Sequence, residues 1–244
     1  MSSTSADGKT TGKVVLIGAG PGAADLITVR GARILSQADV VLYDALVTDE
    51  MLALCPQAEK ISVGKRSGQR STAQTVINQQ LVECARKYRL VVRLKGGDPM
   101  IFGRADEELR ALEAEGIEVE VVPGITAATA AAASTRLPLT KRGIARSIAF
   151  FTSSTAPDHP DETTLPDCDT LIQYMGGKEA IVTAQKLLAQ GRPADLPVVV
   201  VENCSRPDEK VQLLKLGELE NGLAGRSGPV LVMIGAAFAP RTGS

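Results

Sequence analysis

The sequence predicts an α/β protein made of two α/β domains with mostly parallel sheets and a ligand cleft between them. Short apolar runs typical of buried strands alternate with longer segments of helical periodicity along most of the 244 residues. A Pro-Gly pair at 123–124 interrupts this alternation near the middle, and a second series of the same kind follows it. Strands that alternate with helices favour parallel pairing, with helices on both faces of the sheet.

The Pro-Gly pair sets the predicted domain boundary. We expect residues 1–12, which are polar and lack the apolar core of a signal peptide, to form a disordered tail. Residues 13–123 then form the N-terminal domain. Its predicted strands occupy residues 14–17, 40–43, 61–63, 90–94 and 119–122, and its predicted helices occupy residues 26–37, 48–54, 73–87 and 105–115.

Residues 124–240 form the predicted C-terminal domain. It opens with residues 125–135, a stretch rich in Ala and Thr that favours a helix packed closely against its neighbours. The segment 153–166 is rich in Ser, Thr, Pro and Asp, which predicts a mobile loop. The predicted strands of this domain occupy residues 147–152, 170–174, 198–202, 211–215 and 230–234, with a helix at 179–190.

Composition argues against several classes of function. A net charge of -1, 3% aromatic residues and the absence of Trp argue against a nucleic-acid partner. No apolar run approaches the ~18 residues that would span a bilayer, so no membrane segment is expected. The four cysteines form no CxxC pair, which predicts reduced thiols in a cytoplasmic protein. The single histidine, His159, lies in a polar segment, so we expect neither a histidine-based catalytic triad nor a metal site.

The first glycine loop follows the first predicted strand, where residues 18–22 have the sequence Gly-Ala-Gly-Pro-Gly. Glycines at such a position let the backbone approach a ligand closely. One interpretation is the fingerprint of a nicotinamide-dependent oxidoreductase, with Asp44 as the acid that binds the ribose. Against it, Ala23 stands where the third glycine belongs, and Pro21 removes an N–H that a pyrophosphate would bind. A tight turn without any ligand is the other alternative.

The second glycine loop, residues 94–104, follows the most strongly predicted strand of the first half. Gly96 and Gly97 expose bare backbone at the end of this strand. Asp98 adds a carboxylate that could accept ribose hydroxyls or face a cation. S-adenosylmethionine (SAM) carries a sulfonium and an ammonium group, so an open acidic loop suits it.

Cationic side chains follow this loop and the small-residue helix. Arg104 opens a predicted helix, where its charge opposes the helix dipole, so an anionic ligand would explain its position. Glu107, by contrast, suits the dipole and needs no function there. Lys141 and Arg142 form a local basic patch, which is either solvated surface or a contact for a polycarboxylate substrate.

Seven groups of short motifs occur in one order and together resemble the tetrapyrrole methylase family. The resemblance extends over residues 13–236, and it is specific because all seven are in register. YDALV and the extended GGDP run are the most discriminating pair. The motifs are GAGPG (18–22) with DLIT (25–28), YDALV (43–47), VGKR (63–66), RLKGGDP (93–99) with FGR (102–104), PGITA (123–127), PLT (138–140) with Arg142, and YMG (174–176).

The resemblance implies an enzyme that transfers two methyl groups from SAM to uroporphyrinogen III, giving precorrin-2 and S-adenosylhomocysteine (SAH) in a pathway to sirohaem or cobalamin. It also implies a homodimer with SAM in the cleft between its domains. Asp44 and Lys65 match positions proposed as proton acceptor and donor, and Arg104, Glu107 and Arg142 match substrate contacts. The positions that match SAM-lining residues are Pro21, Gly96, Gly97, Asp98, Ile101, Thr126, Ala127, Met175 and Cys204.

This sequence departs from the family pattern at several site positions. Lys141 stands where the family often has His, and Cys204, which could narrow an adenosine pocket, where it often has Gly. Residues 152–154 are Thr-Ser-Ser in place of Thr-Gly-His. A sister enzyme of the family that methylates a later corrin precursor is the nearest alternative. A nicotinamide-dependent oxidoreductase is the alternative from another class.

Overall fold

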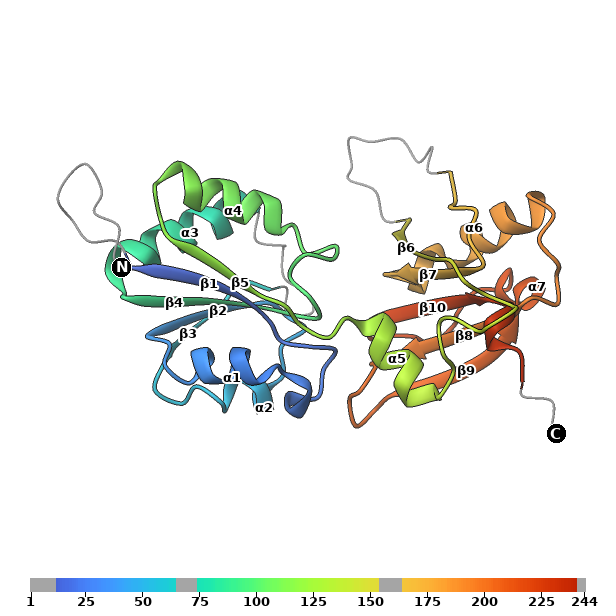
Figure 1. The fold of residues 1–244 in the computed structure, drawn as a ribbon, viewed down its shortest axis with the longest axis horizontal. Coiled ribbons are helices and arrows are strands. Elements are labelled where there is room, and N and C mark those ends of the chain that lie inside the picture. Colours follow the sequence, from blue (N-terminus) through green and yellow to red (C-terminus); the bar gives the residue numbers. More distant parts are fainter. Residues whose placement is uncertain (1–11, 65–73, 154–163, 241–244) are drawn as a thin grey trace. The chain divides into compact units, whose positions relative to one another are not determined.

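The computed structural model describes residues 12–64, 74–153 and 164–240, which fold into two compact units (Figure 1). The chain passes from the first unit to the second between Thr126 and Ala127. Each unit contains one five-stranded sheet. Residues 1–11 of the predicted tail and residues 154–163 of the predicted mobile loop lie outside the described residues.

The first unit is built on a sheet with the strand order β3-β2-β4-β1-β5, in which every pairing is parallel. Most residues of the central strands β1 and β4 are buried, as parallel strands covered by helices on both faces require. The five predicted strands of this domain are confirmed. Their bounds are β1 (Lys13–Gly18), β2 (Val40–Tyr43), β3 (Glu59–Ser62), β4 (Leu90–Lys95) and β5 (Val119–Val122).

Helices cover both faces of this sheet. α1 (Val29–Leu35) and α2 (Asp49–Leu52) lie on one face, and α3 (Gln74–Lys87) and α4 (Ala105–Ala114) lie on the other (Figure 1). Two separate apolar cores fill the space between the sheet and the helices. Successive residues of a strand point to opposite faces, so each central strand contributes side chains to both cores.

The predicted helix 26–37 is shorter than expected. A 3-10 turn, η1 (Ala24–Leu26), comes first, and α1 begins only at Val29. The hydroxyl of Thr28 caps α1 by accepting a hydrogen bond from the backbone N–H of Gly31 at 3.1 Å. Apolar residues continue through both segments, so their periodicity did not reveal the interruption.

The strand order creates a topological switch point between β1 and β4. The chain leaves β1 through α1 toward β2, and it leaves β4 through α4 toward β5, on the other side of β1. The helices that follow these neighbouring strands lie on opposite faces of the sheet, so the chain continues from the two carboxyl ends toward opposite faces (Figure 1). Open parallel sheets bind their ligands at such a point.

The second unit has a mixed sheet with the order β6-β7-β10-β8-β9. Only the pairing of β6 with β7 is parallel, so the prediction of a mostly parallel sheet was wrong here. Residues 203–209 that join β8 to β9 are too few for a crossover, and such short connections produce antiparallel neighbours. The strands are β6 (Ile148–Thr152), β7 (Thr170–Tyr174), β8 (Pro197–Glu202), β9 (Lys210–Lys215) and β10 (Val230–Gly235).

The described part of the second unit contains α5 (Ala127–Thr135), α6 (Gly176–Ala189) and α7 (Leu216–Leu219), with a 3-10 turn η2 (Ala236–Phe238). α6 and α7 pack on one apolar core of the sheet. The sequence did not predict α7, because four residues are too few to show an amphipathic period. Within the described ranges, no helix combines the length and the hydropathy that a bilayer span requires. All four cysteines are unpaired.

Glu202, the last residue of β8, holds the turn before β10. One carboxylate oxygen accepts hydrogen bonds from the backbone N–H groups of Ser227 and Gly228, at 2.8 and 2.9 Å. The other accepts one from Arg226 at 3.1 Å, and the Glu202 side chain is only 1% exposed. These donors, led by the backbone N–H of Gly228, lower the pKa of Glu202 from 4.5 to about 2.

Glu202 should make stability depend on pH. Because its folded-state pKa is lowered, the carboxylate stabilises the fold above about pH 4.5, and this contribution is lost as the pH falls toward about 2. We expect Glu202→Gln to lower the free energy of unfolding by about 2 kcal/mol or more at neutral pH, since buried backbone donors lose a charged acceptor. Urea denaturation at several pH values measures this difference, which should shrink below about pH 4.5. A difference that is the same at every pH would contradict the assignment.

Candidate functional site

Two glycine turns meet at the switch point, at the carboxyl ends of β1 and β4. The backbone N–H of Gly97 donates to the carbonyl of Gly20 at 2.7 Å, and the N–H of Gly20 donates to the carbonyl of Gly97 at 3.2 Å. The N–H of Ala19 also donates to the carbonyl of Lys95 at 2.7 Å. The two turns that the sequence singled out separately therefore form one structure, joined by backbone hydrogen bonds.

A third turn, after β5, packs against these two through backbone atoms alone. A Cβ atom added to Gly124 would lie 2.2 Å from the carbonyl oxygen of Gly97 and 2.7 Å from the Cα of Gly18. A Cβ atom added to Gly18 would lie 2.5 Å from the Cα of Gly124. Real side chains do not fit at such distances, so lack of space requires glycine at both positions.

Gly97 is required for a different reason. Its φ of 68° lies in the left-handed region that disfavours other residues. No heavy atom beyond its chain neighbours would lie within 4 Å of a Cβ atom added there. The backbone of Gly97 therefore borders open space, and a ligand can approach it directly.

The carboxylate of Asp98 ties the turn after β4 to the turn after β5. One oxygen accepts a hydrogen bond from the backbone N–H of Met100, and the other accepts one from the N–H of Gly124, both at 2.9 Å. Asp98 thus has a structural role in addition to the ligand contact that the sequence predicts. Each oxygen can accept a further hydrogen bond, so this role leaves room for a ligand.

Asp44 makes the corresponding link between the ends of β2 and β4. One oxygen accepts a hydrogen bond from the backbone N–H of Leu46 at 2.9 Å, and the other accepts one from the N–H of Gly96 at 3.0 Å. The residue is half-buried. The side chain that the resemblance associates with proton transfer is therefore held against the loop that carries Gly96 and Gly97.

Charged side chains are buried beneath this loop. The guanidinium of Arg93 and the ammonium of Lys95 donate to different oxygens of Glu108, at 2.9 and 2.8 Å. All three side chains are 5% exposed or less. Gln74 on α3 adds a longer hydrogen bond to Glu108 at 3.4 Å. Burial is the main cause that lowers the pKa of Lys95, and the neighbouring charge of Arg93 lowers it further.

Arg104 already has an anionic partner within the chain. It lies just before α4 with a φ of 54°, and its guanidinium donates to both carboxylate oxygens of Glu107, at 2.7 and 2.8 Å. Glu107 thus supplies an anion that accounts for the position of Arg104 without a ligand, and a contact of Arg104 with an anionic substrate stays a prediction. Both side chains are about half exposed and can still exchange partners.

In the second unit, three predicted site residues come together where β7 and β8 end. The thiol of Cys204 lies 3.9 Å from the carbonyl oxygen of Ala127. The backbone N–H of Ala128, at the start of α5, donates to the hydroxyl of Tyr174 at 3.3 Å. Met175 precedes α6 with a φ of 56°, and its side chain is exposed. A positive φ is uncommon for such a residue and shows that its surroundings hold it there.

The thiol of Cys204 is unreactive. Burial is the main cause that raises the pKa of its thiol to about 12, and the charge of Glu209 adds to the effect. The thiol therefore stays protonated and fills space as a small apolar group. The expectation that it narrows an adenosine pocket stays a prediction.

The remaining predicted site residues lie at separate positions in the two units. Lys65 lies outside the described residues. Arg142 is exposed in the turn 141–145. Pro21 and Ile101 are half-buried in the two glycine turns of the first unit, and Thr126 is buried at its end. In the part of the chain that the structure describes, no group of three His, Cys, Asp or Glu side chains could hold a metal ion.

Sequence reasoning missed the buried charges, although a signal was present. Arg93 and Lys95 alternate with apolar residues in a strand that otherwise has the composition of a fully buried one. Charged side chains in such a strand are costly unless they are paired, so a partner was to be expected. Glu108 gave a weaker signal, because acidic residues in the first turn of a helix suit its dipole without further explanation.

All of these loops lie within a segment that matches a known family. The sequence profile of the tetrapyrrole (corrin/porphyrin) methylases matches residues 13–220. The chain belongs to the tetrapyrrole methylase family. This confirms the resemblance predicted from the seven groups of motifs.

This tetrapyrrole methylase is similar to bacterial siroheme synthases. Siroheme synthase 2 of Yersinia pestis (strain Pestoides F) is 45% identical over 231 residues, which cover 93% of this chain and 49% of the relative. Siroheme synthase 1 of Pectobacterium atrosepticum is 47% identical over 228 residues, which cover 92% and 48%. The chain thus spans about half the length of the curated relatives it matches.

Solved structures of similar proteins span almost the whole length of this methylase. Uroporphyrin-III C-methyl transferase from Thermus thermophilus, in complex with S-adenyl homocysteine, is 39% identical with a TM-score of 0.79, covering 93% of this chain and 98% of that one. A cobalt precorrin-4 methyltransferase of cobalamin biosynthesis is 31% identical with a TM-score of 0.80, covering 93% and 96%.

The glycines of the three turns should respond differently to one added methyl group. We expect Gly124→Ala to lower the free energy of unfolding by about 3 kcal/mol or more, because the methyl group would collide with fixed backbone. Gly97→Ala should cost only about 1 to 2 kcal/mol, because it adds strain in φ but meets no atom. Urea denaturation of both variants measures the difference. Equal losses would mean that the turns are not packed as described.

Proposed function

We propose that this chain is a SAM-dependent methyltransferase that transfers two methyl groups to carbon atoms of uroporphyrinogen III, yielding precorrin-2 and SAH. The observation that carries the proposal is the pair of hydrogen-bonded glycine turns at the switch point, with the Gly97 backbone open on one side. The similar structure named for uroporphyrin-III C-methyl transferase, which contains the demethylated product of SAM, supports this choice of ligand and substrate.

The residues at the switch point fit SAM. Bare backbone at Gly97 allows a flat nucleoside to approach, and the carboxylates of Asp44 and Asp98 place negative charge on the same loops, where a sulfonium and an ammonium group would be stabilised. Further proposed SAM contacts, carried over by position from the family, are Pro21, Gly96, Ile101, Thr126, Ala127, Met175 and Cys204.

SAM supplies the methyl group as an electrophilic sulfonium. The chain's task is to hold an electron-rich pyrrole carbon close to that methyl group and to exclude water. Attack by a neutral pyrrole carbon leaves a cationic ring, which must then lose a proton. Asp44, fixed by two backbone donors, is our candidate for stabilising this charge and accepting the proton, and Lys65 is the candidate donor.

The substrate carries several carboxylates, which need cationic partners. Arg142 is exposed and pairs with none of the described residues, so it can form a bidentate contact with a carboxylate. Arg104 can do so by exchanging Glu107 for the substrate. We also propose that the protein is a cytoplasmic homodimer. The exposed Val211 and Leu213 on the edge strand β9 are consistent with an interface there.

Anaerobic incubation with SAM and uroporphyrinogen III tests the proposal. Mass spectrometry should show a tetrapyrrole that has gained two methyl groups, with two equivalents of SAH. Absence of transfer from a folded protein would contradict the proposal. Transfer only to a later corrin precursor would identify the sister activity instead. Stabilisation against heat by NAD but not by SAM would favour the oxidoreductase alternative.

A side chain at Gly97 should obstruct SAM without unfolding the protein. Gly97→Leu places a large side chain in the open space at the switch point, so SAH affinity should fall by about 100-fold or more. Gly116→Leu is the matched control, because Gly116 has a φ of 66° and the same open surroundings at the end of α4. Both variants carry a similar backbone strain. Titration calorimetry with SAH should separate them, and equal affinities in folded proteins would exclude Gly97 from the site.

A further inference from the structure

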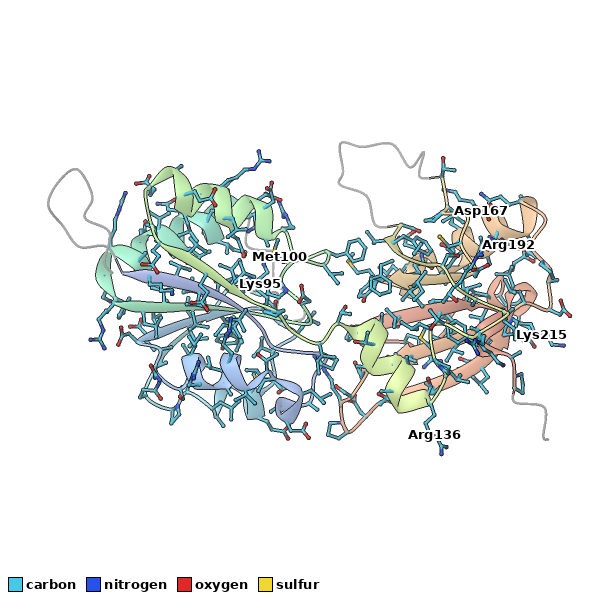
Figure 2. All side chains as sticks on the ribbon, viewed as in Figure 1. Lys95, Met100, Arg136, Asp167, Arg192 and Lys215 are labelled. Carbon is cyan, nitrogen blue, oxygen red and sulfur yellow. The ribbon has the colours of Figure 1, made fainter. Side chains whose placement is uncertain are left out.

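The helix α5 begins with Ala127, a proposed SAM contact, but its own side chains do little to fix where it lies. Alanine makes up most of the helix, and an alanine side chain buries little apolar area. Among the described residues, α5 also makes few close contacts with the other helices and strands. Its last residue is Thr135, and Figure 2 labels Arg136 just beyond that end. The position of Ala127, at the opposite end, therefore depends on specific contacts of the first turn.

A hydrogen bond from Tyr174 supplies the stronger of two such contacts. The backbone N–H of Ala128 donates to the hydroxyl of Tyr174 at 3.3 Å, whereas the carbonyl oxygen of Ala127 has only the thiol of Cys204 at 3.9 Å, a weak donor. An N–H group in the first turn of a helix has no acceptor within the helix. Ala128 is fully buried, so water cannot easily take the place of the hydroxyl. Without Tyr174, the first turn of α5 would have to move to satisfy this donor.

The ring of Tyr174 is itself held by the sheet. Tyr174 is the last residue of β7, where it pairs with Thr152 of the neighbouring parallel strand β6. Its ring packs edge-on against the ring of Phe150, with 5.8 Å between the ring centroids. The next residue is Met175, whose exposed side chain is another proposed SAM contact. A single side chain thus connects the strand end that carries Met175 with the helix that begins at Ala127.

We propose that Tyr174 is a positioning residue for SAM, whose hydroxyl fixes the first turn of α5 so that Ala127 and Met175 keep the spacing that bound SAM requires. The inference rests on the proposed function and deepens it. Groups that are already in place before the ligand arrives cost less to order on binding, so this hydroxyl contributes to affinity without contacting the ligand.

Removing the hydroxyl alone tests the proposal. Tyr174→Phe keeps the ring and its contact with Phe150, and it leaves the N–H of Ala128 without its acceptor. We expect the affinity for SAH, measured by titration calorimetry, to fall about 5- to 10-fold, which corresponds to the loss of one hydrogen bond. The KM for SAM should rise by a similar factor, and the amide hydrogen of Ala128 should exchange faster with solvent.

Tyr88→Phe is the matched control. It removes the same atom in the first unit, from a hydroxyl that also forms hydrogen bonds, with Glu59 and Lys87. This variant should bind SAH as the unaltered protein does. A folded Tyr174→Phe variant that is less stable in urea but binds SAH with unchanged affinity would overturn the proposal, because the hydroxyl would then support only the fold. Failure of the unaltered protein to bind SAH would overturn the proposed function as well, so the two failures are distinguishable.

Discussion

The site depends on the contact of three backbone turns at the carboxyl ends of β1, β4 and β5. Gly20 and Gly97 exchange hydrogen bonds there, and Gly124 fits against the Gly97 carbonyl and Gly18 only because neither Gly124 nor Gly18 has a side chain. This contact brings the loops of the switch point together while it leaves one side of Gly97 open. The parallel sheet makes the contact possible, since it places the three strand ends at one edge.

Carboxylates reinforce this arrangement. Asp98 joins the turn after β4 to the turn after β5, and Asp44 joins it to the loop after β2. Both use backbone N–H groups as partners, so their positions are fixed by the sheet and do not depend on long, flexible side chains. The buried ion pair of Lys95 and Glu108 lies beneath the same loop and helps to hold it in place. Asp44 and Asp98 thus hold the loops in place, and both are also proposed to act on the ligand.

The sequence was sufficient to predict the elements and several members of the site, but not how they are joined. Short runs that contain apolar residues located the ten strands of the described residues, because strands are short and bounded by polar turns. They did not predict the antiparallel pairings of the second sheet. There β10 lies between β7 and β8, and the order of strands in a sheet cannot be recognised from the residues of any one segment. The motifs singled out both glycine turns, whereas the hydrogen bonds between Gly20 and Gly97 depend on β1 lying beside β4. The ion pair of Arg104 with Glu107 was not predicted, because the two residues were considered separately.

The most direct test of the central claim is to follow backbone amide signals by NMR while SAH is added to the unaltered protein. If the coupled turns hold the ligand, the largest changes within the first unit should fall on Gly20, Gly97 and Asp98, and they should saturate together. Saturable binding that leaves these three amides unchanged would contradict the claim, because the ligand would then bind elsewhere.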